Sequence, residues 1–300
     1  MIADKHIALF LILLPVLAGC SESGISLYEE KETPYGEYLG EPPPDSIPKR
    51  FCPQFFSEEM HSPPVFSPDG MEVYWTLMGD GYNKILEMRR EGDRWSAPAE
   101  SPFNLRNQND APFLTPDGQR IYFLSAQGSG AGDFDENMYY AKRDGDRWSD
   151  PVRLPDIIND HPLHWQFSVA ASYNLYFQDQ DSHEIYISEF VEGHYQSPSR
   201  LPESVNSAGS QESSPFIDPE EEFLIFCRMT DGFYTDLYIS FKDSANTWKE
   251  AVSLGDVINT EGHDMYAYIT GDRLFLFFLR STSSGLFPFW VDAGFIDALR

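Results

Sequence analysis

Short apolar stretches bounded by turn residues recur along the chain from about residue 46. The two clearest copies of the pattern are Phe66–Trp75 (FSPDGMEVYW) and Leu114–Phe123 (LTPDGQRIYF). The β-branched and aromatic residues on either side of the turn are typical of strands. Within the turn, proline fixes φ, aspartate bonds the neighbouring backbone and glycine accepts a positive φ. The pattern therefore predicts two antiparallel strands joined by a tight turn.

Three weaker copies of this pattern follow, so the chain is internally repetitive. They begin at Ser168, Ile217 and Ile269, which places the five starts 48, 54, 49 and 52 residues apart. Every unit has a second strand-like stretch, at Ile85–Leu86, Met138–Tyr140, Ile185–Ile187, Leu237–Ile239 and Phe289–Val291. The first four units add a third stretch, at Trp95–Pro98, Trp148–Pro151, Tyr195–Pro198 and Trp248–Ala251. Each unit thus predicts a four-stranded antiparallel sheet, and radial stacking of such sheets buries their faces.

The repeated motif resembles the WD40-like β-propeller repeat (PD40) found in the propeller half of the TolB family. The resemblance covers residues 46 to about 292 and implies an all-β propeller built from four-stranded blades. The fifth unit lacks the tryptophan-containing outer stretch, whereas Ile47–Phe51 has the spacing of such a strand. We therefore expect a propeller domain over residues 46–300, with five blades closed by the N-terminal strand. Six blades stay open as an alternative, because the TolB propeller has six.

The N-terminal segment resembles the signal peptide of a bacterial lipoprotein. The run Ile7–Ala18 is apolar apart from one proline, too short to span a membrane but suited to a signal peptide. Leu17-Ala18-Gly19-Cys20 resembles a lipobox, which implies removal of residues 1–19 and lipidation of Cys20 (diacylglycerol and palmitate). An ordinary signal peptide followed by a chance cysteine is the alternative.

Residues 20–45 are polar, acidic and rich in proline and glycine, so we expect a flexible tether there. Ser21 after the cysteine resembles outer-membrane sorting in Gram-negative bacteria. The expected location is the cell envelope, on the outer membrane facing the periplasm, with the lipid as the only membrane contact. Deleting residues 21–40 should then leave the ring intact.

The chain is strongly acidic, with 21 basic and 48 acidic residues and a formal net charge of −27. Such a charge repels phosphate backbones, so we exclude nucleic acid as a partner. The aromatic residues follow the strand periodicity, which favours blade packing over a sugar-stacking platform. Cys227 closes the apolar run Phe223–Cys227 and is predicted to be a buried thiol rather than a partner of Cys52 in a disulfide.

A candidate site follows from the repeat, because residues that enter the five inner strands meet around one axis. Ligand contacts are expected from His61, Asp110, His164, Glu212, His263 and Asp264. Imidazoles and carboxylates around an axis suit a divalent metal, and the carboxylates favour cationic ligands. In the alternative, the same side chains only cap the strands. Asp133-Phe134-Asp135-Glu136-Asn137 has the alternating oxygens of a calcium loop, with a solvated acidic loop as the alternative.

Two functions are compatible with these residues. One is a binding or scaffold module for an envelope protein, a peptide or a glycan. The other is a metal-assisted envelope enzyme, a polysaccharide lyase or glycosidase, that uses the histidines at the mouth. The sequence has no G-x-S-x-G motif and no phosphate-binding glycine loop. We therefore favour the binding module, with no catalytic residue and no cofactor assigned.

Overall fold

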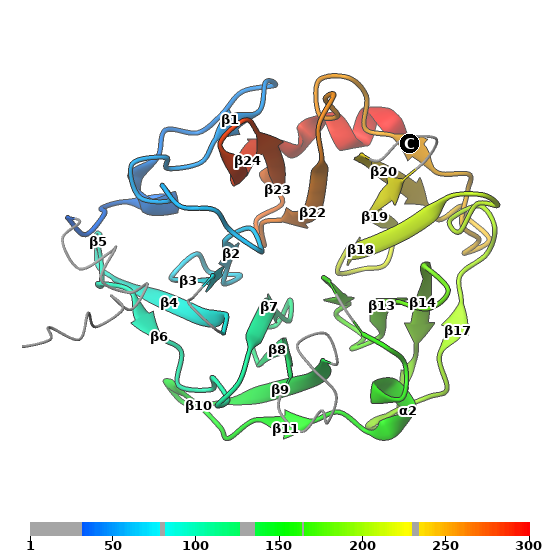
Figure 1. Ribbon diagram of the computed structural model, residues 1–300, viewed down its shortest axis with the longest axis horizontal. Coiled ribbons are helices and arrows are strands. Elements are labelled where there is room, and N and C mark those ends of the chain that lie inside the picture. Colours follow the sequence, from blue (N-terminus) through cyan, green and yellow to red (C-terminus); the bar gives the residue numbers. More distant parts are fainter. Residues whose placement is uncertain (1–31, 79–81, 127–135, 164, 230–233) are drawn as a thin grey trace, which may run out of the picture.

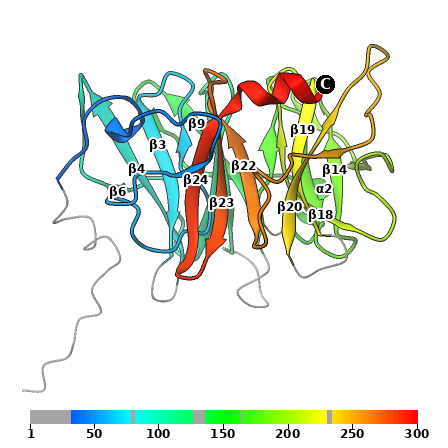
Figure 2. The same ribbon diagram turned by 90° about the horizontal axis from the view of Figure 1, so that it is seen from above.

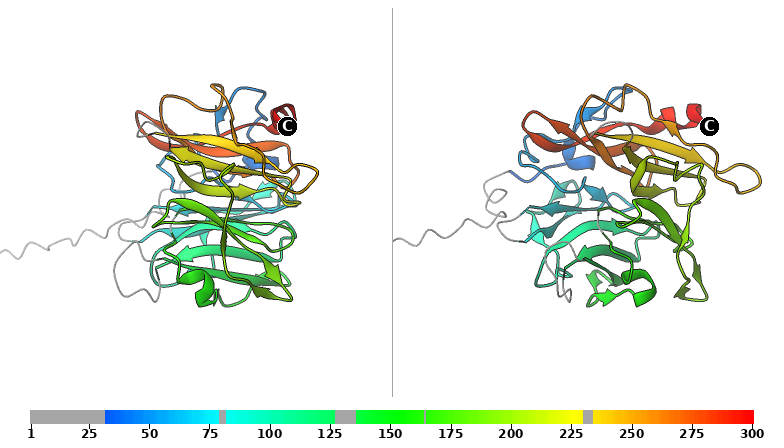
Figure 3. Two further views of the ribbon diagram at one scale, coloured as in Figure 1. Left: turned by 90° about the vertical axis from the view of Figure 1, so that its right-hand side faces the viewer. Right: turned by 45° about the vertical axis from the view of Figure 1, so that its right-hand side comes forward.

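Five small antiparallel sheets surround a central axis in the computed structural model (Figure 1), which describes residues 32–78, 82–126, 136–163, 165–229 and 234–300. Each sheet is one blade, and its innermost strand lies beside the axis. The fold is an all-β propeller, and the five blades predicted from the repeat are confirmed within these residues. Figures 2 and 3 show the ring from the side, with the strands of neighbouring blades standing next to one another.

The strands of each blade follow one another from the axis outwards. Blade 1 consists of β2 (Val65–Phe66), β3 (Glu72–Leu77), β4 (Lys84–Glu91), β5 (Arg94–Trp95) and β6 (Ala99–Glu100). Blade 2 consists of β7 (Asn109–Leu114), β8 (Arg120–Ser125), β9 (Asn137–Asp144), β10 (Arg147–Trp148) and β11 (Val152–Arg153). Blade 3 consists of β12 (Ser168–Val169), β13 (Leu175–Asp179), β14 (Glu184–Ser188) and β17 (Ser199–Arg200), beside the hairpin β15 (Phe190–Val191) and β16 (His194–Tyr195). Blade 4 consists of β18 (Gln211–Ile217), β19 (Phe223–Met229), β20 (Thr235–Phe241) and β21 (Val252–Ser253).

The fifth blade is completed by the N-terminal strand, as the spacing predicted. It consists of β22 (Asp264–Ile269), β23 (Phe275–Thr282), β24 (Gly285–Asp292) and, outermost, β1 (Lys49–Arg50). Lys49 lies opposite Trp290, and the backbone N–H of Phe51 donates to the carbonyl of Pro288 at 2.8 Å. Residues from the two ends of the domain therefore close the ring, and β1 pairs with the edge of β24 that would otherwise be the outer edge of this blade.

The outer strand differs from its prediction, because the tryptophan motif does not itself form the whole strand. In blade 1, Trp95 pairs with the end of β4, whereas β6 begins only after Pro98. Blade 2 has the same division, with β10 before Pro151 and β11 after it. Proline has no N–H to donate to a neighbouring strand, so the outer pairing is interrupted there and resumes one residue later.

The turn between the first two strands has the same conformation in all five blades. In blade 1, Ser67 Oγ donates to Asp69 at 2.6 Å, and the N–H of Gly70 donates to the carbonyl of Ser67 at 2.8 Å. The last turn residue has a positive φ in every blade, although only the first two carry glycine: Gly70, Gly118, Tyr173, Glu221 and Arg273. The weak copies of the repeat therefore retain the turn, although a residue other than glycine adopts the backbone conformation that normally favours glycine.

Part of the segment expected to be a tether packs against the propeller instead. Tyr38 contacts the rings of Phe66 and Phe275 edge-on, with centroids 5.0 and 5.1 Å apart, and Leu39 is 4% exposed. Trp95 Nε1 donates to the carbonyl of Gly36 at 2.8 Å. We call residues 34–40, which include the short turn η1 (Glu37–Gly40), the clasp. The clasp bridges blades 5 and 1 because its few apolar residues fill the seam where the ring closes.

Helices are few and short in the described part of the chain. Besides η1, they are α2 (Asp156–Asn159) and η2 (Ala293–Leu299), which follows β24 along the rim towards blade 4 (Figures 1 and 2). At its end, Arg300 forms an ion pair with Glu222 of blade 4. Among the described residues, none of the helices has the length and apolar character needed to cross a membrane.

Candidate functional site

The residues predicted to form the site lie where the inner strands begin, at one end of the channel that we call the strand-start mouth. Asp110, Glu212 and Asp264 occupy the first or second position of β7, β18 and β22. His61 and His263 precede the inner strands of blades 1 and 5. His164 lies outside the described residues. The structure thus places five of the six side chains at the same end of the ring.

His61 and Asp110 form an ion pair between blades 1 and 2. The pair joins His61 Nδ1 to Asp110 Oδ2, which also accepts from Asn83 Nδ2 at 3.1 Å. Burial alone would lower the pKa of His61, but the charge of Asp110 and the bond to it raise this pKa above its usual value. Burial opposes ionisation of Asp110, yet His61 lowers the pKa of that carboxyl. The contact links two blades and leaves Asp110 2% exposed.

Glu212 and Asp264 each pair with an arginine on the neighbouring strand. Arg228 Nε donates to Glu212 Oε1 at 2.9 Å, and Arg280 Nε donates to Asp264 Oδ1 at 2.6 Å. Both carboxylates are almost fully buried, so these partners compensate the charge of each one. The expectation that the carboxylates select cationic ligands therefore lacks support at these two positions. Arginine follows the acid by the same interval in both repeats, a regularity that could have predicted the pairing.

A pocket at the strand-start mouth brings two of the predicted residues together with several others. It lies between blades 3, 4 and 5 and has about 910 Å³ of space not filled by protein atoms. We call it the mouth pocket and define it by the lining residues Trp165, Gln178, Gln180, Glu212, His263 and Tyr266. Asp110 and His61 line a smaller cavity beside it, which shares Trp165 and Tyr266 with the mouth pocket.

Three acceptor oxygens of the mouth pocket have no hydrogen-bond donor within the described residues. They are Gln178 Oε1, Gln180 Oε1 and Glu212 Oε2, and each of the three atoms is buried. The second oxygen of Glu212 remains unpaired because Arg228 and Ser210 both donate to Oε1. Buried polar atoms in native proteins almost always have a partner, so unpartnered acceptors converging on one pocket indicate a place for a donor from outside the chain.

His263 lies in the pocket as a neutral imidazole. The backbone N–H of Thr235 points to His263 Nδ1 at 3.4 Å, and the Thr235 hydroxyl lies 3.2 Å from the same nitrogen. A backbone N–H can only donate, so Nδ1 accepts and carries no proton. Burial also lowers the pKa of His263. His263 therefore contributes a polar imidazole to the lining of the mouth pocket and no positive charge.

Two aromatic rings form one wall of the mouth pocket. The centroid of Trp165 lies 5.9 Å from those of both Tyr266 and His61. Tyr266 has a φ of 60° at a bulge in β22, and its backbone N–H approaches Cys227 Sγ at 3.4 Å. Cys227 is buried as predicted, and burial raises the pKa of its thiol to about 12. The bulge thus fixes the tyrosine ring at the edge of the channel.

Sequence reasoning missed the glutamines and the tryptophan of the pocket. Gln178 occupies the position that Leu124, Cys227 and Leu279 hold in other blades, as the strand registers show. A polar amide at a position that is apolar or weakly polar in the other repeats could have marked Gln178 as a candidate site residue. Trp165 carries no such signal, because a tryptophan within the repeat also fits simple core packing.

The residues considered as metal ligands do not gather in the described part of the chain. No group of three or more His, Cys, Asp or Glu side chains is placed there to hold one ion. In the segment considered as a calcium loop, residues 133–135 lie outside the described residues. Asn137 begins β9, and its Oδ1 accepts from Arg153 Nη2 at 2.7 Å and from Nε at 3.1 Å. That oxygen is therefore engaged within blade 2.

The opposite end of the channel, which we call the turn mouth, has two hollows that differ from the mouth pocket. The central one, of about 540 Å³, is lined mainly by apolar residues including Phe66, Phe113, Phe216 and Tyr268. Its buried acid Asp218 lies 2.9 Å from Arg273. The hydroxyl of Tyr268 donates to the carbonyl of Phe66 at 2.7 Å. Tyr268 is thus satisfied within the protein, whereas Asp218 Oδ1 faces Arg273 as an ion pair and has no hydrogen bond within the described residues. The apolar lining is typical of packing around a closed channel end.

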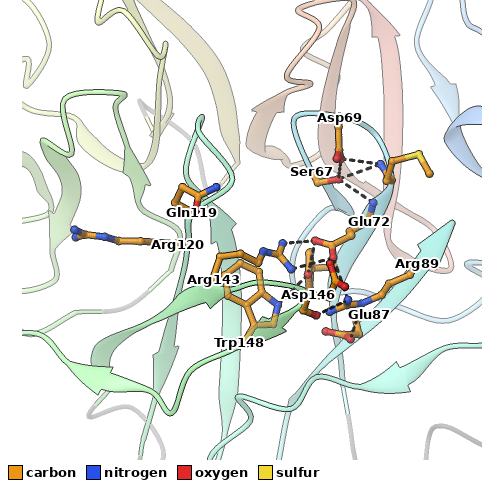
Figure 4. Close-up of polar contacts among 12 residues, drawn as sticks. Ser67, Asp69, Glu72, Glu87, Arg89, Gln119, Arg120, Arg143, Asp146 and Trp148 are labelled. Atoms are coloured by element: carbon orange, nitrogen blue, oxygen red, sulfur yellow. Dashed lines mark hydrogen bonds and ion pairs between the residues drawn. The ribbon is translucent and has the colours of Figure 1, made fainter. Parts of the chain in front are cut away.

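The second hollow is a polar cleft between blades 1 and 2 (Figure 4). Arg143 donates to both carboxylate oxygens of Glu72, at 3.1 and 2.5 Å, and its guanidinium lies 3.7 Å from the ring centre of Trp148. Arg89 donates to the carbonyl of Asp146 at 2.9 Å. The charged groups of the cleft thus bond to each other across the seam, so the cleft holds two blades together and offers few free groups to a ligand.

Comparison with known proteins gives a fold and no family. No protein-family model matches the sequence, and no curated protein is similar to it. The putative TolB from Agrobacterium tumefaciens is similar in structure, with a TM-score of 0.51 and 14% identity over 78% of this chain and 77% of that chain. TolB from Acinetobacter baumannii has a TM-score of 0.50 and 12% identity over 77% of this chain. The match spans only 56% of the Acinetobacter protein. These similarities show the TolB-like β-propeller fold.

Proposed function

We propose that this chain is a lipid-anchored β-propeller of the cell envelope that acts as a binding module and holds a partner in the mouth pocket. The observation that carries the proposal is the convergence of three buried, unpartnered acceptors on one hollow, from Gln178, Gln180 and Glu212. Buried polar atoms normally have a partner, so three unpartnered acceptors around one hollow favour a ligand that supplies the donors. The lipobox-like residues Leu17–Cys20 and the TolB-like fold support the envelope location.

The enzyme alternative has less support at this mouth. A metal-assisted lyase needs ligands that gather around its ion, and a glycosidase needs a pair of carboxyl groups for acid–base chemistry. Among the described residues, Asp110 pairs with His61, Asp264 pairs with Arg280 and Glu212 pairs with Arg228. These contacts neutralise the acids that catalysis would require. The unpartnered atoms of the mouth pocket are suited to recognition instead.

Site-specific crosslinking in living cells tests the binding module. Gln211 is exposed and lines the mouth pocket, so a photoreactive amino acid at this position should capture the bound partner. Leu274, which is 53% exposed near the turn mouth, is the matched control position. We expect a crosslinked species at Gln211 that is absent at Leu274. Identical crosslinking at both positions, or none at Gln211, would refute binding at the mouth pocket.

A further inference from the structure

The chemistry of the mouth pocket restricts what its partner can be. Gln178 is 3% exposed and Glu212 is 1% exposed, yet each has one oxygen without a donor. The oxygen of Gln180 is unpartnered in the same pocket. A buried acceptor without a partner has lost its hydration and gained no hydrogen bond, so a ligand that supplies O–H or N–H donors at these points is favoured.

The charge of the pocket favours an uncharged donor. Among the described residues that line it, Glu212 is the single carboxylate, and Arg228 Nε bonds it at 2.9 Å. His263 accepts a backbone N–H and is neutral. A lysine or arginine side chain would therefore enter a hollow with no free counter-charge and would lose its hydration there. Hydroxyl groups donate hydrogen bonds without this cost.

The walls of the pocket complement a ring with both polar and apolar faces. Trp165 and Tyr266 supply aromatic surface, and Met229 and Met265 supply further apolar surface. The amide nitrogen of Gln178 is engaged with His183 Nδ1 at 3.5 Å, so the group that this amide leaves to a ligand is its acceptor oxygen. A sugar ring has apolar C–H faces and hydroxyls that both donate and accept, so it matches aromatic walls and side-chain amides together.

We propose that the mouth pocket binds an uncharged glycan, with hydroxyl groups of one sugar ring donating to Gln178, Gln180 and Glu212 and the ring packing beside Trp165 and Tyr266. This inference rests on the proposed binding function and names the class of its partner. A basic peptide is the competing class, and the experiment separates the two.

Titration of the full chain carrying Cys20→Ser tests the ligand class. The probes are neutral hexasaccharides of glucose, xylose and N-acetylglucosamine, a hexauronate and hexalysine, each followed by calorimetry at low and high salt. We expect at least one neutral hexasaccharide to bind with an affinity independent of salt. Gln180→Leu should weaken that binding about three- to tenfold, as the loss of one hydrogen bond predicts. Gln196→Leu, at an exposed glutamine outside the pocket, should leave it unchanged.

A second variant, Gln178→Met, preserves side-chain volume and should weaken binding similarly, with folding of each variant checked by its urea midpoint. Salt-sensitive binding of hexalysine without binding of any neutral glycan would overturn the glycan assignment while leaving the mouth pocket as the site. So would a crosslink from Gln211 to a protein when no neutral hexasaccharide binds. Absence of a crosslink at Gln211 would refute the proposed function itself.

Discussion

The clasp makes the sharpest stability prediction, because it lies in a segment whose composition indicated a tether. Leu39 is 4% exposed and belongs to the main hydrophobic core of the propeller. Leu39→Ala should lower the free energy of unfolding by about 2–5 kcal/mol, the usual cost of emptying a buried leucine site. Such a loss is a large fraction of the roughly 5–15 kcal/mol that stabilises a typical domain. Leu39 has a φ of 57°, a conformation that is strained for leucine and alanine alike. The difference in stability between the two therefore measures the loss of side-chain packing and not a change in backbone strain.

Urea unfolding of the full chain carrying Cys20→Ser, followed by tryptophan fluorescence, measures this loss. Ile47→Ala is the matched control, because Ile47 is an aliphatic residue of the same N-terminal region that is 66% exposed. The control should change stability by less than about 0.5 kcal/mol. A Leu39→Ala variant as stable as the control would show that the clasp is not part of the folded unit. The same reasoning reverses the expectation for deletion of residues 21–40, which should now destabilise the ring.

Three further predictions concern the anchor, the mouth and the closing strand. Cys20→Ser should move the protein from the membrane fraction to the soluble fraction, and unchanged membrane association would refute the lipid anchor. The raised pKa of His61 means that its pairing stabilises the fold fully below about pH 6.5 and is lost as pH rises through the raised value. Between about pH 6 and about pH 9, the native chain should therefore lose more unfolding free energy than Asp110→Asn, and equal losses would contradict the linkage. Phe51→Ala, at a side chain that is 0% exposed in the closing seam, should cost about 3–5 kcal/mol in urea unfolding, whereas a cost below about 1 kcal/mol would exclude closure through this strand.

The candidate site was only partly predictable from the sequence. The repeat placed Glu212 and His263 at the end of the channel where the mouth pocket lies, because equivalent residues of a repeat have equivalent positions around the axis. It could not assign their partners. Glu212 is neutralised by Arg228, and the contact depends on the register between β18 and β19. The unpartnered oxygens of Gln178 and Gln180 can likewise be recognised only in the folded structure, where the positions of the nearby hydrogen-bond donors are known.

Local chemistry in the sequence determined the blades, their number and the strand that closes the ring. Turn residues and strand periodicity determine the conformation of a short stretch of chain. The strands and the turn of a repeat such as Phe66–Trp75 can therefore be predicted from its own residues. Tertiary structure decided what lies between blades. The clasp segment looks like a linker by composition, yet Tyr38 and Leu39 are placed by aromatic residues far away in sequence, such as Phe275. Residues of three blades likewise line the mouth pocket. Contacts between blades join residues that lie far apart in the sequence, so local composition does not predict them.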